Sequence, residues 1–346
     1  MSHPKDAEVP LKPDRIHQFG FGFAPPLILE AAVRHGVFDS LDDGPKTMDE
    51  IVAACGASRR GLRAILNALV GLEFLQKDAD CYALTRESAE YLVSRKSSFQ
   101  GGIFRHVSRQ LLPNWMKLSE AVQSGRPPTA VNREEVGGEF FRQFVEDLFP
   151  RGYPAAKALS EALALKNSAV PTRVLDLAAG SGVWSIALAE CSAAVRVTAV
   201  DWPEVVPVTR KVAEQCHVAD QFQFIEGDLL EVDFGSGFHV ATLGHILHSE
   251  GEDRSRQLLT KVFNALVPAG TIAIAEMVPN EDRTGPASAL IFAVNMLVHT
   301  EEGDAFTFSE IADWLQESGF VNPRQHEVPA PSPLILANKP GEEAAS

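Results

Sequence analysis

The chain has 346 residues, of which 45% are hydrophobic, and a formal net charge of −15. A chain of this length can bury a large core and usually forms two domains, whereas its negative charge disfavours nucleic acid and anionic membranes as partners. No apolar run reaches transmembrane length, and residues 1–15 lack the apolar centre of a signal peptide, so we expect a soluble, cytoplasmic protein. The cysteines and histidines show no metal-ligand spacing, and we therefore expect no metal site.

Residues 1–100 show helical patterns followed by a short hairpin. Thr47 and Glu50 have the spacing of a capping box, and Ser58 is placed to cap the helix that follows. The stretch Leu75–Leu84 has the pattern of a small β-hairpin. This combination predicts a winged-helix-like domain.

Residues 101–166 form a predicted helical linker, interrupted by a stretch with Gly and Pro at Ser124–Asn132. Large apolar side chains are frequent in it: Trp115, Met116, Phe140, Phe141, Phe144 and Phe149. Pockets for flat organic ligands have mostly apolar walls, so this segment could roof a substrate pocket, with Trp115 and Phe144 among its lining residues. Packing in a hydrophobic core is the alternative for each of these side chains.

The stretch Arg173–Asp201 has the order strand, glycine turn, helix and strand that is typical of a nucleotide-binding unit. Val174–Leu177 is a short apolar run, and Gly180 and Gly182 let a ligand approach the backbone where a side chain would block it. Asp201 ends the next apolar run about 20 residues after the turn, where a carboxylate can accept hydrogen bonds from both ribose hydroxyls. We therefore predict a cofactor that contains a nucleoside.

The acidic residues around this turn favour S-adenosylmethionine over a dinucleotide. Asp176 lies inside the strand before the turn, where it would repel a phosphate but could accept from an ammonium group, and Ser185 stands where a dinucleotide site usually has Gly or Ala. Asp228 ends a further strand and could face an adenine amino group, with an ordinary turn residue as the alternative. The predicted cofactor contacts are Asp176, Gly180, Gly182, Asp201, Trp202, Asp228 and Leu229.

From Pro171 onward the pattern alternates between strands and helices. The expected strands are residues 173–178, 195–200, 222–226, 238–244 and 271–277. A helix over Thr307–Ser318 precedes two extended runs, Val321–Val328 and Leu334–Ala337, which would close the sheet as an antiparallel pair. This order predicts a doubly wound α/β sheet.

Residues 287–300 form a further predicted helix, one face of which mixes polar and apolar side chains. Phe292, Asn295, Met296 and His299 recur at helical spacing on this face. A mixed face suits a pocket better than a core, so we predict that these four residues contact the substrate.

From Pro25 to about Pro340 the chain resembles the dimeric O-methyltransferases of the caffeic acid and hydroxyindole type, including their bacterial natural-product relatives. The resemblance rests on VLDLAAGSG (174–182), VDWPEVVPVTR (200–210), GDLL (227–230), HILHSEGEDRSRQLL (245–259) and AGTIAIAE (269–276). It implies a Rossmann-like, doubly wound, seven-stranded methyltransferase domain over residues 167–346, preceded by an α-helical winged-helix domain that forms a homodimer. It also implies methyl transfer from S-adenosylmethionine to a hydroxyl group of a small aromatic or polyketide-like metabolite.

His248 is the predicted general base, because it follows the fourth strand and ligands of such sheets bind outside the carboxyl ends of the strands. A phenol has a pKa of about 10 and a histidine about 6.5, so complete proton transfer before attack would be uphill by roughly 5 kcal/mol. Proton removal during attack on the methyl group avoids that cost. The resemblance assigns one orienting glutamate to Glu276, whereas the second falls on Ala305, for which Asp304 is the candidate substitute.

Two further positions depart from the family pattern, since Glu250 stands where the family has Trp and Gly244 where it has a Lys near the cofactor. The missing second glutamate leaves a non-methylating reaction such as decarboxylation or hydroxylation open as an alternative, and the sequence also leaves nitrogen or carbon acceptors open. Another alternative is a ligand-responsive regulator that binds DNA through the winged helix. Its phosphate contacts would be Arg59, Arg60 and Arg63, which are too few for a basic stripe.

Overall fold

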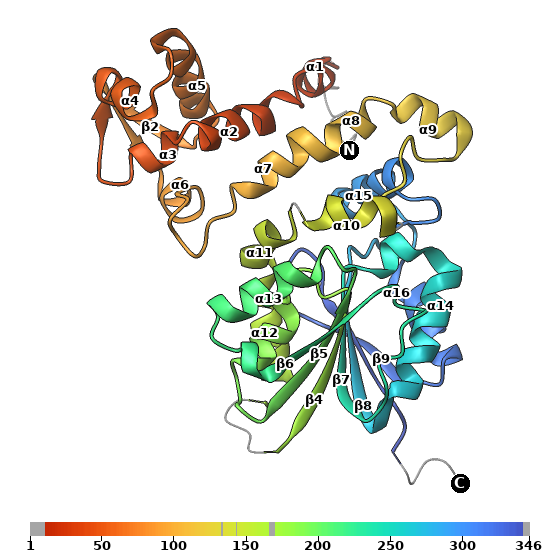
Figure 1. Ribbon diagram of the computed structural model, residues 1–346. Helices are drawn as coiled ribbons and strands as arrows, with labels where there is room; N and C mark the ends of the chain where they lie inside the picture. The colour runs from red at the N-terminus through yellow and green to blue at the C-terminus, as the bar shows by residue number, and fades with distance from the viewer. Residues whose placement is uncertain (1–10, 133, 143, 166–169, 342–346) are drawn as a thin grey trace, which may run out of the picture. The chain divides into compact units, whose positions relative to one another are not determined.

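The computed structural model describes residues 11–132, 134–142, 144–165 and 170–341 (Figure 1). The chain divides into two compact units, Met1–Ser108 and Arg109–Ser346. Most of the predicted linker, residues 101–166, thus belongs to the second unit. That the linker forms a separate part of the molecule stays a prediction. Within the described residues, no helix is long and apolar enough to cross a membrane.

The first unit is helical and contains one small sheet. Its elements in chain order are α1 (Asp14–Gly20), α2 (Ala24–Arg34), α3 (Val37–Ser40), β1 (Lys46–Thr47), α4 (Met48–Cys55), α5 (Arg59–Gly71), β2 (Leu75–Asp78), β3 (Cys81–Leu84), α6 (Arg86–Tyr91) and α7 (Gly102–His106). The three strands pair antiparallel in the order β1-β3-β2, and the apolar faces of α2 to α5 share one buried core.

Signals in the local sequence determine where the helices of this unit begin. The Thr47 hydroxyl accepts from the backbone N–H of Glu50, whose carboxylate accepts in turn from the N–H of Thr47, and Ser58 caps α5 through its own hydroxyl. The predicted hairpin is present, with Leu75 opposite Leu84. These elements confirm the predicted helical N-terminal domain.

The second unit begins with helices and continues as an α/β sheet. Its first helices are α8 (Leu112–Trp115), α9 (Leu118–Ser124), α10 (Glu134–Arg142) and α11 (Val145–Ala162), after the π-helix η1 (Val107–Leu111) at the boundary between the units. The sheet consists of β4 (Thr172–Leu177), β5 (Val195–Asp201), β6 (Phe222–Glu226), β7 (Phe238–Gly244), β8 (Leu266–Ala275), β9 (Val321–His326) and β10 (Leu334–Asn338). The helices between the strands are α12 (Val183–Ala189), α13 (Val206–Gln215), η2 (Ala219–Gln221), α14 (Leu247–Ala265), α15 (Ala287–His299) and α16 (Phe308–Glu317).

The seven-stranded sheet has the order β6-β5-β4-β7-β8-β10-β9. Its first five strands in this order are parallel, whereas β10 is antiparallel to both β8 and β9. Helices cover both faces: α11, α12 and α13 pack on one side, and α14 and α16 on the other (Figure 1). The predicted doubly wound sheet with its closing antiparallel pair is confirmed.

The direction of winding reverses between β4 and β7, which are neighbours in the sheet. In sheets of this kind, a ligand crevice lies outside the carboxyl ends of the strands at that reversal. Leu177 is in register with both Val200 and Leu243, so the segments that follow β4, β5 and β7 leave the sheet at the same edge. The glycine turn, Trp202 and His248 follow these three strands.

Candidate functional site

The turn after β4 is joined to the end of β5 through the Asp201 carboxylate. The backbone N–H of Gly180 donates to its Oδ2 atom and the N–H of Trp202 to its Oδ1 atom, both at 2.7 Å. Gly180 and Gly182 have φ values of +57° and +74°, a conformation that favours glycine. Burial raises the pKa of Asp201 to about 6. Each carboxylate oxygen retains a second lone pair, so Asp201 can accept from a further donor such as a ribose hydroxyl.

Asp176 is fully buried and lies among hydroxyl groups. Ser185 on α12 donates to one of its oxygens and Thr242 on β7 to the other, the latter at 2.6 Å. Burial raises its pKa to about 6. The acid therefore ties β4 to α12 and β7, and its contact with the ammonium group of a ligand stays a prediction.

Asp228 follows β6 and makes contacts that the sequence did not reveal. Its Oδ1 atom accepts from the N–H of Leu230 at 2.8 Å, and its Oδ2 atom accepts from Arg254 on α14 at 2.7 Å. Leu229 is buried in the core on the α14 side. Trp202, half-buried, has its ring centroid 5.8 Å from that of Phe141 on α10.

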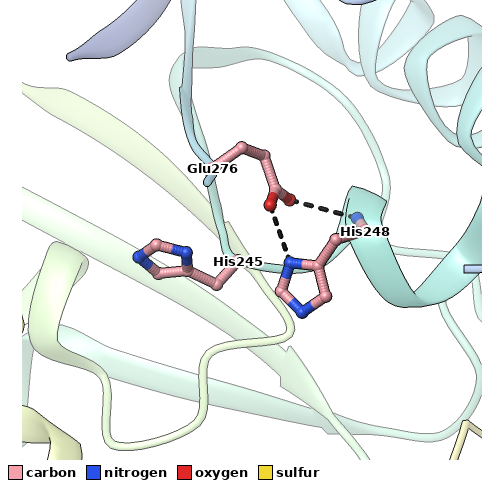
Figure 2. A group of neighbouring side chains, drawn as sticks. All are labelled: His245, His248 and Glu276. Carbon is pink, nitrogen blue, oxygen red and sulfur yellow. Dashed lines mark hydrogen bonds and ion pairs between the residues drawn. The ribbon is translucent and has the colours of Figure 1, made fainter. Parts of the chain in front are cut away.

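His248 and Glu276 form a hydrogen-bonded pair at the ends of β7 and β8 (Figure 2). The His248 Nδ1 atom lies 2.7 Å from Glu276 Oε2, and the backbone N–H of His248 donates to Oε1 at 3.3 Å. Burial raises the pKa of Glu276, but the charge and hydrogen bonds of His248 outweigh it and leave the pKa below its usual value. With Nδ1 bound to the carboxylate, the Nε2 atom is available for a substrate proton. The predicted pairing of these residues is present.

His245 lies next to this pair and was missed in the sequence. His245, His248 and Glu276 each place a possible ligand atom within 4.8 Å of the others. His248 and Glu276 are already joined in the 2.7 Å hydrogen bond, so the arrangement is that of a histidine paired with a carboxylate, with an exposed imidazole beside them. The φ of His245 is +62°, which is uncommon for a residue with a side chain and could not have been read from the sequence.

Asp304 meets His248 through its backbone. Its N–H donates to the His248 carbonyl at 3.0 Å, whereas its Oδ2 atom lies 3.8 Å from Arg283 and its Oδ1 atom accepts from the N–H of Ala305. Among the described residues, no hydrogen bond joins the Asp304 carboxylate to the His248 ring. The carboxylate therefore does not stand in for the second glutamate in this structure.

The helix α15 brings one of the predicted substrate contacts, Phe292, against His248. The ring of Phe292 packs edge-on against His248 at a centroid distance of 4.8 Å, and Asn295 accepts from the indole N–H of Trp115 at 2.9 Å. The other predicted contacts, Met296, His299 and Phe144, are buried. Burial lowers the pKa of His299, and its Nδ1 atom lies 2.9 Å from the Asn295 carbonyl oxygen.

Gly244 at the end of β7 leaves room for the indole of Trp184. A Cβ atom at Gly244 would overlap the Trp184 ring, which extends from α12. This contact explains why the chain has no side chain at the position where a lysine was expected from the resemblance. Trp184 itself was not recognised in the sequence, because its partner lies on a different element.

Comparison with known proteins gives a consistent result. A model of the O-methyltransferase domain matches residues 115–321, and a model of the O-methyltransferase dimerisation domain matches residues 17–94. The tetracenomycin polyketide synthesis 8-O-methyl transferase TcmO of Streptomyces glaucescens is 28% identical over 95% of this chain and 97% of its own length. The acetylserotonin O-methyltransferase of Gallus gallus is 29% identical over 89% of this chain and 92% of its own length. A solved structure assigned as an O-methyltransferase from Nostoc punctiforme has a TM-score of 0.88 and 27% identity, covering 96% of this chain and all of that one.

Proposed function

The chain belongs to the S-adenosylmethionine-dependent O-methyltransferases with a dimerisation domain, and on that premise we propose that it methylates a hydroxyl group of a small aromatic metabolite with His248 as general base. The observation that carries this proposal is the His248–Glu276 pair at the same edge of the sheet as the glycine turn and Asp201. A base and a nucleoside-binding turn at one edge are what methyl transfer from a nucleoside cofactor requires.

The sheet order supports the placement of the cofactor. The neighbouring strands β6, β5, β4 and β7 are followed by Asp228, Asp201, the glycine turn and His248 in that order. Strands lie about 4.8 Å apart, so this row spans about 14 Å, enough for an extended nucleoside with an amino-acid tail. Asp201 would accept from the ribose, Asp228 would face the adenine, and Gly180 and Gly182 would lie along the tail.

His248 and Glu276 have different roles in the proposed proton transfer. Glu276 bonds Nδ1 of His248, which fixes the tautomer with Nε2 as the proton acceptor, and its charge stabilises the imidazolium that forms. His248 takes the hydroxyl proton at Nε2 as the oxygen attacks. The bound cofactor supplies a methyl group made electrophilic by the sulfonium. Phe292, packed against the imidazole, limits the orientations of the ring and provides an apolar wall for the acceptor.

The nature of the acceptor is inferred from the walls of the site. Phe292, Trp115 and the rings of α10 supply aromatic surface, while Asn295 supplies a polar group. The names of two relatives refer to a polyketide and to acetylserotonin, which fits a flat acceptor with a hydroxyl group. We expect the acceptor to be a phenol or a polyketide-like aromatic.

A second copy of the chain is the expected partner. Ile16, Phe19, Phe21 and Phe23 in and after α1 are between 57% and 75% exposed, an apolar surface that a soluble protein usually covers. The match to a dimerisation domain over residues 17–94 indicates that a second copy covers it. Light scattering at micromolar concentration should give twice the chain mass of 37.5 kDa, and a monomer would contradict this part of the proposal.

The reaction can be tested with the purified chain, S-adenosylmethionine and a panel of phenolic, anilinic and carbanionic acceptors. Mass spectrometry should show S-adenosylhomocysteine together with an O-methylated product. The partners of the Asp304 carboxylate, which are Arg283 and the N–H of Ala305, are the observation that favours a non-methylating reaction as the second candidate. Conversion of an acceptor without formation of S-adenosylhomocysteine would establish that candidate and overturn methyl transfer.

A further inference from the structure

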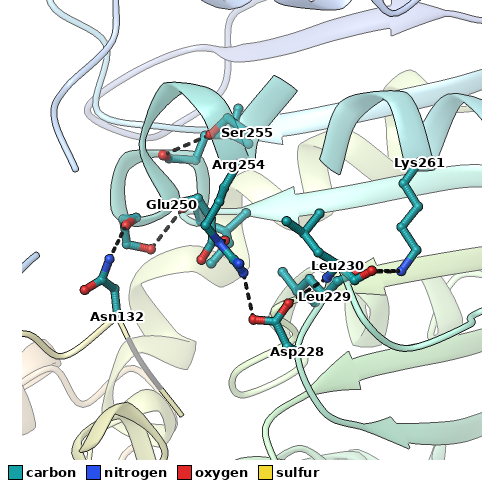
Figure 3. A network of polar contacts seen from close by, with 11 residues as sticks. Asn132, Asp228, Leu229, Leu230, Glu250, Arg254, Ser255 and Lys261 are labelled. Carbon is teal, nitrogen blue, oxygen red and sulfur yellow. Dashed lines mark hydrogen bonds and ion pairs between the residues drawn. The ribbon is translucent and has the colours of Figure 1, made fainter. Parts of the chain in front are cut away.

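Arg254 lies between two carboxylates next to the cofactor edge. Its Nη2 atom donates to Asp228 Oδ2 at 2.7 Å and its Nε atom to Glu250 Oε2 at 2.6 Å (Figure 3). The guanidinium is planar and rigid, so it fixes the two acids relative to each other. We propose that Arg254, held by Glu250, is a positioning residue that presents the Asp228 carboxylate to the adenine amino group and thereby sets nucleobase specificity. This inference rests on the proposed cofactor.

The Asp228 carboxylate is held from two sides and still has capacity for a ligand. Oδ1 accepts from the N–H of Leu230, and Lys261 on α14 donates to the carbonyl oxygen of Leu229 at 2.8 Å, which holds the loop itself. The Asp228 side chain retains 24% of its exposure. Because each oxygen has a further lone pair, the acid can accept a hydrogen bond from a ligand without losing Arg254.

Glu250 explains why Arg254 is fixed and not a mobile surface side chain. The Glu250 side chain is only 6% exposed, and burial raises its pKa although Arg254 opposes this effect. A buried carboxylate without a cation is costly, so the pair is held together. The ion pair also spans Gly251, whose non-helical backbone interrupts α14 between the turn that carries His248 and the rest of the helix. The Arg254 contacts therefore link this turn to the loop of Asp228.

The charge of the Asp228 carboxylate predicts which nucleobases can bind next to it. An ionised Asp228 only accepts hydrogen bonds, so it favours the amino group of adenine and repels the carbonyl oxygen of hypoxanthine at the same position. Without Arg254, the Oδ2 atom of Asp228 loses the donor that fixes its position. The carboxylate can then rotate away from the amino group, so discrimination between adenine and hypoxanthine should fall.

The test compares binding of S-adenosylhomocysteine and S-inosylhomocysteine to the full chain by calorimetry. The wild type should prefer the adenine form by about 10- to 100-fold, the range expected when one charged hydrogen bond is lost. Arg254→Met should reduce this ratio below about threefold, and Arg254→Lys should give an intermediate value. Arg256→Met is the matched control, because Arg256 lies on the same helix and also pairs with two carboxylates, Glu252 and Glu317. It should leave the ratio unchanged.

Two further variants keep the test decisive. If Arg254→Met fails to fold because Glu250 is left buried and unpaired, Glu250→Gln with Arg254→Met removes both charges and should show the same reduced ratio. An unchanged ratio in a folded Arg254 variant overturns the inference. Asp228→Asn distinguishes the role of Arg254 from the contact between Asp228 and the adenine. If Asp228→Asn lowers the ratio while Arg254→Met does not, only the role of Arg254 fails. If Asp228→Asn also leaves the ratio intact, Asp228 does not face the base, and the proposed cofactor placement fails with it.

Discussion

The two sides of the candidate site are held by different kinds of contact. At the ends of β4 and β5, the Asp201 carboxylate is bonded by backbone N–H groups of Gly180 and Trp202, all within one strand, turn, helix and strand unit. At the end of β7, His248 is held by the side chain of Glu276 and by the backbone of Asp304, which come from later parts of the chain. The cofactor side is thus a local structure, whereas the catalytic side exists only in the folded sheet.

This difference separates the effects expected from substitution. Changes at the ends of β4 and β5 should act on cofactor affinity, because they alter the turn that we propose contacts the cofactor. Changes around His248 should act on the chemical step and leave cofactor affinity nearly unchanged. Variants that affect both quantities equally would show that the two sides are not independent.

The largest effect is expected from His248→Ala. Loss of a general base typically lowers the rate by about 10² to 10⁴-fold, and the proposed cofactor contacts after β4 and at the end of β5 do not involve this residue. Single-turnover kinetics and calorimetry with S-adenosylmethionine measure the two quantities separately. His239→Ala, which removes an exposed imidazole earlier on β7, is the control. A normal rate across pH 6 to 9 would remove His248 from the mechanism.

Asp201→Ala should weaken S-adenosylmethionine binding by about 10²-fold or more. The proposed bonds to two ribose hydroxyls are charge-assisted and contribute roughly 1.5–3 kcal/mol each. Calorimetry gives the affinity, and circular dichroism checks the fold because Asp201 also orders the glycine turn. Asp233→Ala is a matched control, since that exposed acid likewise accepts from a backbone N–H, at Gly235. Unchanged affinity in the folded Asp201 variant would exclude this residue from the site.

Glu276→Gln should lower the rate less than His248→Ala, by about 10- to 100-fold. Glutamine keeps a hydrogen-bond acceptor near His248 Nδ1 but removes the charge that stabilises the imidazolium. The double variant should be little worse than His248→Ala alone, because the two residues act as one unit. Additive losses in the double variant would mean that Glu276 acts independently of the base.

The fold and the local side of the site could be predicted because their signals lie close together in the sequence. The capping box of Thr47 and Glu50 and the antiparallel pair of β9 and β10 were both recognised from short patterns. The environment of Asp176 was not, because Thr242 meets it only through the register of β4 and β7. The role of Arg254 on α14 was missed for the same reason, because its partner Asp228 follows β6, a distant part of the sequence.

Asp176 provides a test through pH. Its folded pKa of about 6 is above the ordinary value of 3.8, so the folded state binds the proton more tightly than the unfolded state does. The contribution of Asp176 to stability is therefore greatest below about pH 4 and decreases as the pH rises to about 6, by about 3 kcal/mol for a shift of this size. Urea unfolding of the wild type and of Asp176→Asn over pH 4–7 measures the difference, which also contains the charge coupling by which Asp176 raises the pKa of Asp201. A difference independent of pH would contradict this reading of the buried acid.

Asp304→Ala should have the smallest effect, with methyl transfer within about threefold of the wild type. The substitution keeps the backbone N–H that donates to the His248 carbonyl, and it removes only a half-exposed carboxylate 3.8 Å from Arg283, a surface pair of a kind that contributes at most about 1 kcal/mol. Gly303→Ala is the contrasting variant, because a Cβ atom at Gly303 would overlap the His248 carbonyl oxygen and displace the turn. Steady-state kinetics should therefore show a loss for Gly303→Ala and almost none for Asp304→Ala. A loss of more than 10-fold for Asp304→Ala, with an altered pH profile, would mean that its carboxylate turns toward His248 when the acceptor binds and replaces the missing second glutamate.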